Sequence, residues 1–181
     1  CGEVRGGNGT IHAQVALPGL GGVLYSRPSA GASGGDIHYL SVCGSGLLAR
    51  VCLADVAGHG SDVAAVGAEM HAHLRRSVDV IDERKVLIRL NRRLNDRGLG
   101  VMTTAVLATY YLPRRRLTVS YAGHPTGWLS RADTGAATPL CGPVPPPRHP
   151  GLVDPPTTRG VHAPPPRPPF RGSSRHPLHP P

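Results

Sequence analysis

The chain has 181 residues, a length typical of one domain or at most two small ones. Its formal net charge is +9 at pH 7, but it contains only seven aromatic residues, too few for the base-stacking surfaces of nucleic-acid-binding proteins. We therefore expect a solvated basic surface and no nucleic-acid partner. We also expect no transmembrane segment, because the longest uncharged, apolar-leaning run, residues 98–113, is too short and contains Thr and Tyr.

The first half of the chain contains patterns typical of strands. Residues 11–17 (IHAQVAL) alternate well enough for a short strand that Pro18 ends. Residues 37–43 and 47–56 are rich in Val, Leu and Ile and are separated by Gly-Ser-Gly, which predicts a β-hairpin. A three-residue turn there would place Cys43 opposite Leu47.

Two helices are predicted next, followed by more strands. Ser61 stands at an N-cap position, and apolar residues recur at helical spacing after it. Asp82 is expected to cap a second helix that ends at Gly98. Strands are then expected over 101–111, over 117–122 and near residues 128–129. This order predicts an α+β fold with antiparallel sheets.

Proline is concentrated at the end of the chain, where sixteen of the twenty prolines lie between residues 139 and 181. Proline cannot donate a backbone hydrogen bond, so we predict a domain over 1–138 and a disordered, Pro-rich tail over 139–181. We favour a truncation or a reading-frame change as its origin, because a GC-rich strand read out of frame gives such a composition. The alternative is a natural extension whose PPPRPP run, residues 164–169, would bind an SH3-like groove.

Cysteine usage bears on the compartment. Four scattered cysteines do not form the pattern of a disulfide scaffold, and no secretory signal is apparent, so we expect a reducing, cytoplasmic location. Cys52 lies in a predicted strand and is expected to be a core residue, not a nucleophile.

Two aspartates are the strongest candidates for chemistry. Asp36 begins the first strand of the predicted hairpin, after a Gly pair, and Asp55 ends the second, so both would lie at its open end. Two converging carboxylates suit a hard divalent cation such as Mg²⁺ or Mn²⁺. Spacing alone leaves open the alternative that these aspartates merely cap turns.

Three motifs occur in order: residues 34–36 (GGD), residues 54–60 (ADVAGHG) and residues 122–125 (AGHP). Together they resemble the bacterial branch of the metal-dependent protein phosphatases, relatives of protein phosphatase 2C grouped with the sporulation stage II protein E. The resemblance covers roughly residues 11–130.

This resemblance implies a β-sandwich flanked by helices, C-terminally incomplete here, with a two-metal site at one edge. Asp36 and Asp55, with the backbone carbonyl of Val56, would bind two Mg²⁺ or Mn²⁺ ions. These ions would activate a water that attacks phosphoserine or phosphothreonine, which makes Asp36 and Asp55 the expected catalytic residues. The remaining motif residues would shape the surrounding loops, with the two histidines holding backbone rather than ligating metal: Gly35, Gly58, His59, Gly60, Gly123 and His124.

The resemblance also implies a function and an alternative to it. Family members act as protein serine/threonine phosphatases in bacterial signalling, often on the phosphoserine of an anti-sigma factor antagonist. The chain departs from the family at Tyr39, where an Asp is common, and at its end, where Asp133 and Asp154 lack the context of the family's two late metal-binding aspartates. The alternative is therefore a catalytically impaired, phosphatase-like interaction module, or a truncated or frameshifted fragment.

Overall fold

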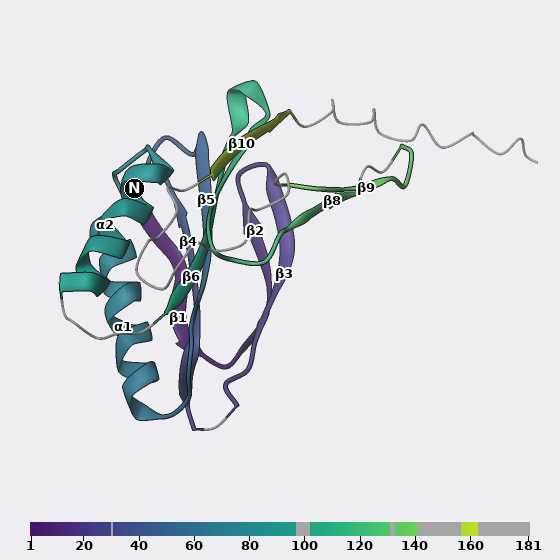
Figure 1. Ribbon diagram of the computed structural model, residues 1–181. Coiled ribbons are helices and arrows are strands. Elements are labelled where there is room, and N and C mark those ends of the chain that lie inside the picture. The colour runs from purple at the N-terminus through teal and green to yellow at the C-terminus, as the bar shows by residue number, and fades with distance from the viewer. Residues whose placement is uncertain (30, 97–101, 131–132, 141–156, 163–181) are drawn as a thin grey trace, which may run out of the picture.

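A single antiparallel sheet organises the protein. The computed structural model describes residues 1–29, 31–96, 102–130, 133–140 and 157–162. Within them, six strands form this sheet in the order β1-β4-β5-β6-β7-β10 (Figure 1). The strands are β1 (Gly2–Gly9), β4 (Ser33–Val42), β5 (Leu48–Val56), β6 (Thr103–Tyr111), β7 (Arg116–Ala122) and β10 (Thr157–His162).

Two helices, α1 (Ser61–Arg76) and α2 (Glu83–Asp96), cover one face of the sheet (Figure 1). Side chains alternate between the two faces of a strand, so every second residue of β4, β5 and β6 meets the helices. The main core forms between these layers and excludes water from the apolar face of each helix. Its buried members include Ile37, Tyr39, Cys52, Val56, Val66, Met70, Leu74, Val86 and Leu107.

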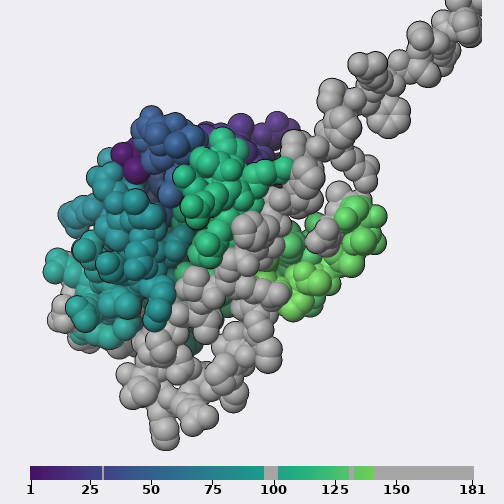
Figure 2. Space-filling view, turned by 90° about the horizontal axis from the view of Figure 1, so that it is seen from above, coloured from purple at the N-terminus to yellow at the C-terminus, as the bar shows by residue number. Residues whose placement is uncertain are grey.

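The opposite face of the sheet is covered by the hairpin of β2 (Ile11–Leu17) and β3 (Leu20–Ser26). Leu17 of this hairpin packs with Leu40 and Ala49 of the sheet in a second core. A further hairpin, β8 (Trp128–Ser130) with β9 (Ala137–Pro139), lies on the side of the molecule opposite the helices (Figure 2). The predicted α+β fold, with an antiparallel sandwich flanked by helices, is confirmed.

Arg50 ties the connection between the helices to the sheet. Its side chain is only 2% exposed, and its Nη2 donates hydrogen bonds to the carbonyl oxygens of Val80 (2.7 Å) and Ile81 (3.3 Å). Burial lowers the pKa of this guanidinium. A charge removed from water is costly unless it is hydrogen-bonded, so the buried Arg50 guanidinium needs these carbonyl partners. Its hydrogen bonds in turn hold the chain between α1 and α2 against the sheet.

The 3-10 turn Leu112–Arg114 links β6 to β7.

The structure corrects one predicted helix start and bears out the other. Gly60, with φ 94°, is the N-cap of α1, and no side chain caps that helix, so the expectation that Ser61 is its N-cap is wrong. Asp82 does cap α2, because its Oδ1 accepts hydrogen bonds from the backbone N–H groups of Arg84 (3.0 Å) and Lys85 (3.3 Å). Gly98, the predicted helix end, lies outside the described residues. No described helix is long and apolar enough to cross a membrane.

The predicted tail over 139–181 contains a strand. Thr157–His162 forms β10 and pairs antiparallel with β7, so the prediction of a wholly disordered tail is wrong for these six residues. The segment TTRGVH has no proline, and its β-branched residues favour an extended backbone whose N–H groups are free to pair with a sheet edge. Apart from residues 139 and 140, the rest of the predicted tail lies outside the described residues.

The cysteines should differ sharply in reactivity. Cys52 is fully buried, as predicted for a core residue, and burial raises the pKa of its thiol to about 12. Cys43 lies beside Ser45, and the contact between its Sγ and Ser45 Oγ (2.9 Å) lowers its pKa. Since the thiolate is the reactive form, iodoacetamide at pH 8 should alkylate Cys43 and leave Cys52 unmodified, as read by peptide mass spectrometry.

Denaturation supplies the control, since in guanidinium chloride both thiols should react at similar rates. Alkylation of Cys52 at the rate of Cys43 in the folded protein would contradict the buried placement of Cys52.

Candidate metal centre

The two candidate aspartates face each other across neighbouring strands. Asp36 of β4 pairs directly with Asp55 of β5 in the antiparallel register. The hairpin turn is longer than expected, because the N–H of Cys43 bonds to the carbonyl of Leu48, not Leu47 (2.9 Å). This shift of one residue from the predicted register is what places Asp36 opposite Asp55.

Both carboxylates are exposed, within reach of solvent, at the end of the sheet where β4 begins and β5 ends, which we call the strand-end edge. β4 and β5 are themselves interior strands of the sheet. Directly opposite Asp55 on the next strand stands Thr104, whose Oγ1 lies 2.9 Å from Nδ1 of His124. Like charges directly opposite each other are destabilising in an antiparallel pair, and a bound cation would offset that repulsion.

His124 lies with Asp36, Asp55 and Thr104 at this site. Burial lowers the pKa of its imidazole, and the negative charges of Asp55 and Asp36 only partly oppose this effect. The imidazole is therefore mainly neutral at pH 7, and its hydrogen bond with Thr104 holds the ring beside the carboxylates. His59, the other motif histidine, is exposed in the loop between β5 and α1.

Gly35 permits the close approach of β4 to the carbonyl expected to bind metal. A Cβ added at Gly35 would lie 2.5 Å from the carbonyl oxygen of Val56 and 2.8 Å from Cγ1 of Val63. Real Cβ atoms do not approach oxygen so closely, so any larger residue would displace the backbone of Val56. The other motif glycines adopt positive φ angles in the loops near the aspartates: Gly58 (120°), Gly60 (94°) and Gly123 (68°).

Asn8 is a positioning residue that the sequence did not reveal. From β1, its Nδ2 donates hydrogen bonds to the carbonyl oxygens of Gly34 (3.0 Å) and Ala64 (2.9 Å). These bonds join the start of β4 to the first turn of α1, next to Asp36. Gly67 leaves the room for this side chain, since a Cβ there would lie 2.9 Å from Nδ2. An Asn within a Gly-rich segment carries no sequence signal for such a role.

The donor set fits one divalent cation better than two. Asp36, Asp55 and the Val56 carbonyl supply hard oxygen ligands of the kind that Mg²⁺ and Mn²⁺ prefer. No group of three or more His, Cys, Asp or Glu side chains that could hold a metal ion occurs in the described part of the chain. Asp133 is exposed near the β8–β9 hairpin, and Asp154 lies outside the described residues.

Comparisons with known proteins bear on this site. The sequence model of the family described as Stage II sporulation protein E (SpoIIE) matches residues 47–160. The structure is similar to the RsbU and RsbW domains of Rv1364c from Mycobacterium tuberculosis (TM-score 0.57, 22% identity), over 72% of this chain and 36% of that one. It is also similar to RsbX in complex with magnesium (TM-score 0.57, 15% identity), over 75% of this chain and 63% of that one.

These matches set the scope of the comparison. The chain spans less than two thirds of the length of either solved structure, and at these low identities the structural similarity shows a shared fold alone. No match is found among the curated proteins. The family match continues to residue 160, so it does not stop at Pro139, where the tail was predicted to begin.

Replacing Gly35 tests the close approach at this site. Gly35→Ala should destabilise the protein by about 1–3 kcal/mol, the usual cost of overpacking, because its Cβ would overlap the Val56 carbonyl. Urea denaturation measures this change. Gly44→Ala in the hairpin turn is the matched control, since a Cβ there meets nothing within 4 Å. Equal stability of the two variants would contradict the described contact.

Proposed function

The chain belongs to the Stage II sporulation protein E family, whose sequence model matches more than half of it, and we propose that it is a divalent-metal-dependent protein phosphatase domain. Its substrate would be a phosphoserine or phosphothreonine of a regulatory protein. The observation that carries this proposal is the direct pairing of Asp36 with Asp55 at the exposed strand-end edge.

The proposed roles follow from the position of each group. Asp36, Asp55 and the carbonyl of Val56 would hold a Mg²⁺ or Mn²⁺ ion, with a second ion expected from the family. A metal at this edge would lower the pKa of a bound water enough for attack on phosphorus near neutral pH. Thr104 orients His124 beside the carboxylates, and the neutral imidazole adds no charge that would compete with a cation.

The exposure of this edge supports a protein substrate. A phosphorylated side chain on another protein can reach Asp36 and Asp55 without either partner unfolding, because both carboxylates face solvent. Membership of the family supports a phosphorylated regulator, such as an anti-sigma factor antagonist, as that substrate. The magnesium named with the RsbX structure supports Mg²⁺ as a cofactor. We place this activity in the cytoplasm and propose no nucleic-acid partner.

A second candidate is a non-catalytic interaction module with the same fold. It is favoured by the small donor set, because the described residues supply two acids at the edge and no third ligand side chain. The presence of Tyr39, where the family commonly has an aspartate, does not favour the interaction module. Tyr39 is 1% exposed and packs in the core beneath the helices, on the face of β4 opposite Asp36.

Metal binding can be measured without turnover. Mn²⁺ at millimolar concentration should raise the melting temperature by a few degrees, because an ion that binds only the folded chain stabilises it by mass action. Asp55→Asn should abolish this shift. Asp79→Asn, which alters an exposed aspartate after α1, should leave it unchanged. An equal shift in Asp55→Asn would place the ion elsewhere.

Turnover then separates the two candidates. We expect slow but detectable Mn²⁺-dependent hydrolysis of p-nitrophenyl phosphate, since the few ligands at this edge would hold a second ion weakly. Any such activity should disappear in Asp36→Asn. Stabilisation by Mn²⁺ without detectable hydrolysis would overturn the phosphatase proposal for this chain in favour of the interaction module.

A further inference from the structure

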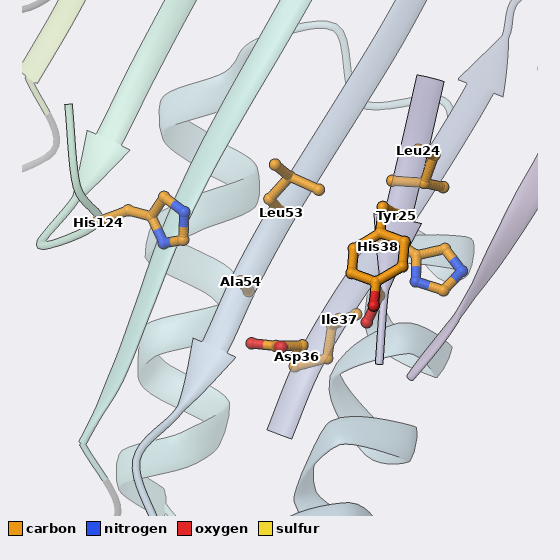
Figure 3. A pocket seen from close by; sticks show the side chains of 9 residues that line it. Leu24, Tyr25, Asp36, Ile37, His38, Leu53, Ala54 and His124 are labelled. Carbon is orange, nitrogen blue, oxygen red and sulfur yellow. The ribbon is translucent and has the colours of Figure 1, made fainter. Parts of the chain in front are cut away.

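A pocket lies beside the candidate metal centre, between β3 and the strands that carry the aspartates (Figure 3). Its volume is about 160 Å³. Leu24 and Tyr25 of β3 and Leu53 of β5 supply apolar side chains to its lining, and Asp36 of the metal centre lines it as well. A ligand bound at the strand-end edge can therefore extend directly into this pocket.

Strand β5 shows how the pocket is placed relative to the metal centre. Val51, Leu53 and Asp55 share the face of β5 away from the helices, because side chains alternate along a strand and Cys52 and Ala54 pack in the main core. Val51 packs in the second core, beneath the β2–β3 hairpin. Leu53, the next residue on this face, remains 36% exposed. The hairpin thus leaves an apolar side chain uncovered between its own core and Asp55.

Tyr25 is the other exposed apolar side chain of the lining. It is 65% exposed, yet its ring meets that of His12, its partner on β2, edge to face, with the centroids 5.7 Å apart and an interplanar angle of 82°. This contact restricts the ring without burying it. Single exposed apolar side chains are common on protein surfaces, but a pair that lines one pocket is typical of a binding surface.

The spacing along β5 determines which residue of a substrate could reach the pocket. Asp55 and Leu53 are two residues apart on one strand, a rise of about 7 Å. In an extended peptide, side chains two residues apart are also separated by about 7 Å and point the same way. A substrate segment that runs along β5 with its phosphorylated side chain at Asp36 and Asp55 therefore directs the side chain two residues away into the pocket.

The volume and the lining favour a large aliphatic side chain. An apolar cavity of about 150 Å³ can hold a benzene molecule, so this pocket has room for a leucine or methionine side chain. Such a side chain would remove the apolar surface of Leu24, Tyr25 and Leu53 from water. The carboxylate of Asp36 would repel an acidic side chain, and a basic one would compete with the cation that Asp36 is proposed to bind.

We propose that this pocket is a specificity site for a leucine or methionine two residues away from the phosphorylated residue of the protein substrate. This inference rests on the proposed phosphatase function and names a feature of its substrate. Tyr25 and Leu53 are then specificity-determining residues, which contact the substrate away from the reacting phosphate.

The test uses peptides that carry a non-hydrolysable phosphonate analogue of phosphoserine, so that binding is measured without turnover. Leucine is moved through the three positions on either side of the phosphonate in an otherwise alanine background, and fluorescence anisotropy in Mn²⁺ gives each dissociation constant. On one side, leucine two residues from the phosphonate should tighten binding about five- to twentyfold over alanine, the effect of partly burying the added carbon groups. Asparagine, similar in shape but polar, should give no gain there. Equal affinity for all peptides, or a gain only at other positions, would overturn the proposal.

Variants of the lining identify the pocket as the source of this preference. Leu53→Ser and Tyr25→Ser should each reduce the preference for leucine to less than twofold, while the affinity for the alanine peptide stays the same. Both variants should fold, because both side chains are substantially exposed. Leu47→Ser is the matched control, since it replaces a leucine that is 42% exposed in the turn between β4 and β5, and it should retain the full preference. A preference that survives in Leu53→Ser would overturn the assignment.

Failure of the proposed function is distinguished by a probe that carries no phosphate. If no peptide binds, N-acetyl-leucinamide is titrated into protein with ¹³C-labelled leucine methyl groups and followed by NMR. Shifts of the Leu24 and Leu53 methyl resonances that N-acetyl-alaninamide does not produce would support the apolar site even though the phosphatase proposal had failed. Absence of such shifts would overturn the site as well. Self-association of the chain that Leu53→Ser abolishes would assign the pocket to a second copy and overturn the proposal.

Discussion

The register between β4 and β5 is the constraint on which the candidate site depends. A slip of one residue would move each side chain of a strand to the opposite face, so Asp36 could not face Asp55. The register is held by two separate cores: Tyr39 and Cys52 are buried against the helices, and Leu40 is buried against the β2–β3 hairpin. Apolar burial on both faces thus stabilises a pairing of like charges that is unfavourable by itself.

The same edge is tied to the helix layer. Asn8 bonds to the carbonyls of Gly34 and Ala64, so the strand before Asp36 and the first turn of α1 are held together. Gly35 lets the strand lie against the carbonyl of Val56. Because these contacts leave little freedom in the backbone around both aspartates, the ligand geometry is largely set before any ion binds, which reduces the entropic cost of binding.

The sequence was informative where patterning is strong and local. The spacing of apolar residues identified both helices, Asp82 was recognisable as a cap, and the strands flanking the Gly-Ser-Gly turn were visible. It was uninformative for β1 and β10, whose pairing partners β4 and β7 are distant in the sequence. It also missed β3, a Gly-rich strand with little apolar alternation that pairs with its neighbour β2. The facing of Asp36 and Asp55 was predicted only approximately, because it depends on the length of one turn. The pocket lined by Tyr25 and Leu53 forms only when a separate hairpin packs on the sheet.

The departures from the family pattern are not equivalent in their physical effect. Tyr39 fills core space on the face of β4 away from Asp36, so it changes packing beneath the helices and leaves the edge ligands unaltered. The number of acids at the edge bears on catalysis directly. Two carboxylates can neutralise the charge of one divalent ion, and water can complete its coordination. A second ion would meet an edge already neutralised by the first. It would therefore be held mainly by added carboxylates or by the phosphate of the substrate, so the chemistry of this edge depends on what binds beside Asp36 and Asp55.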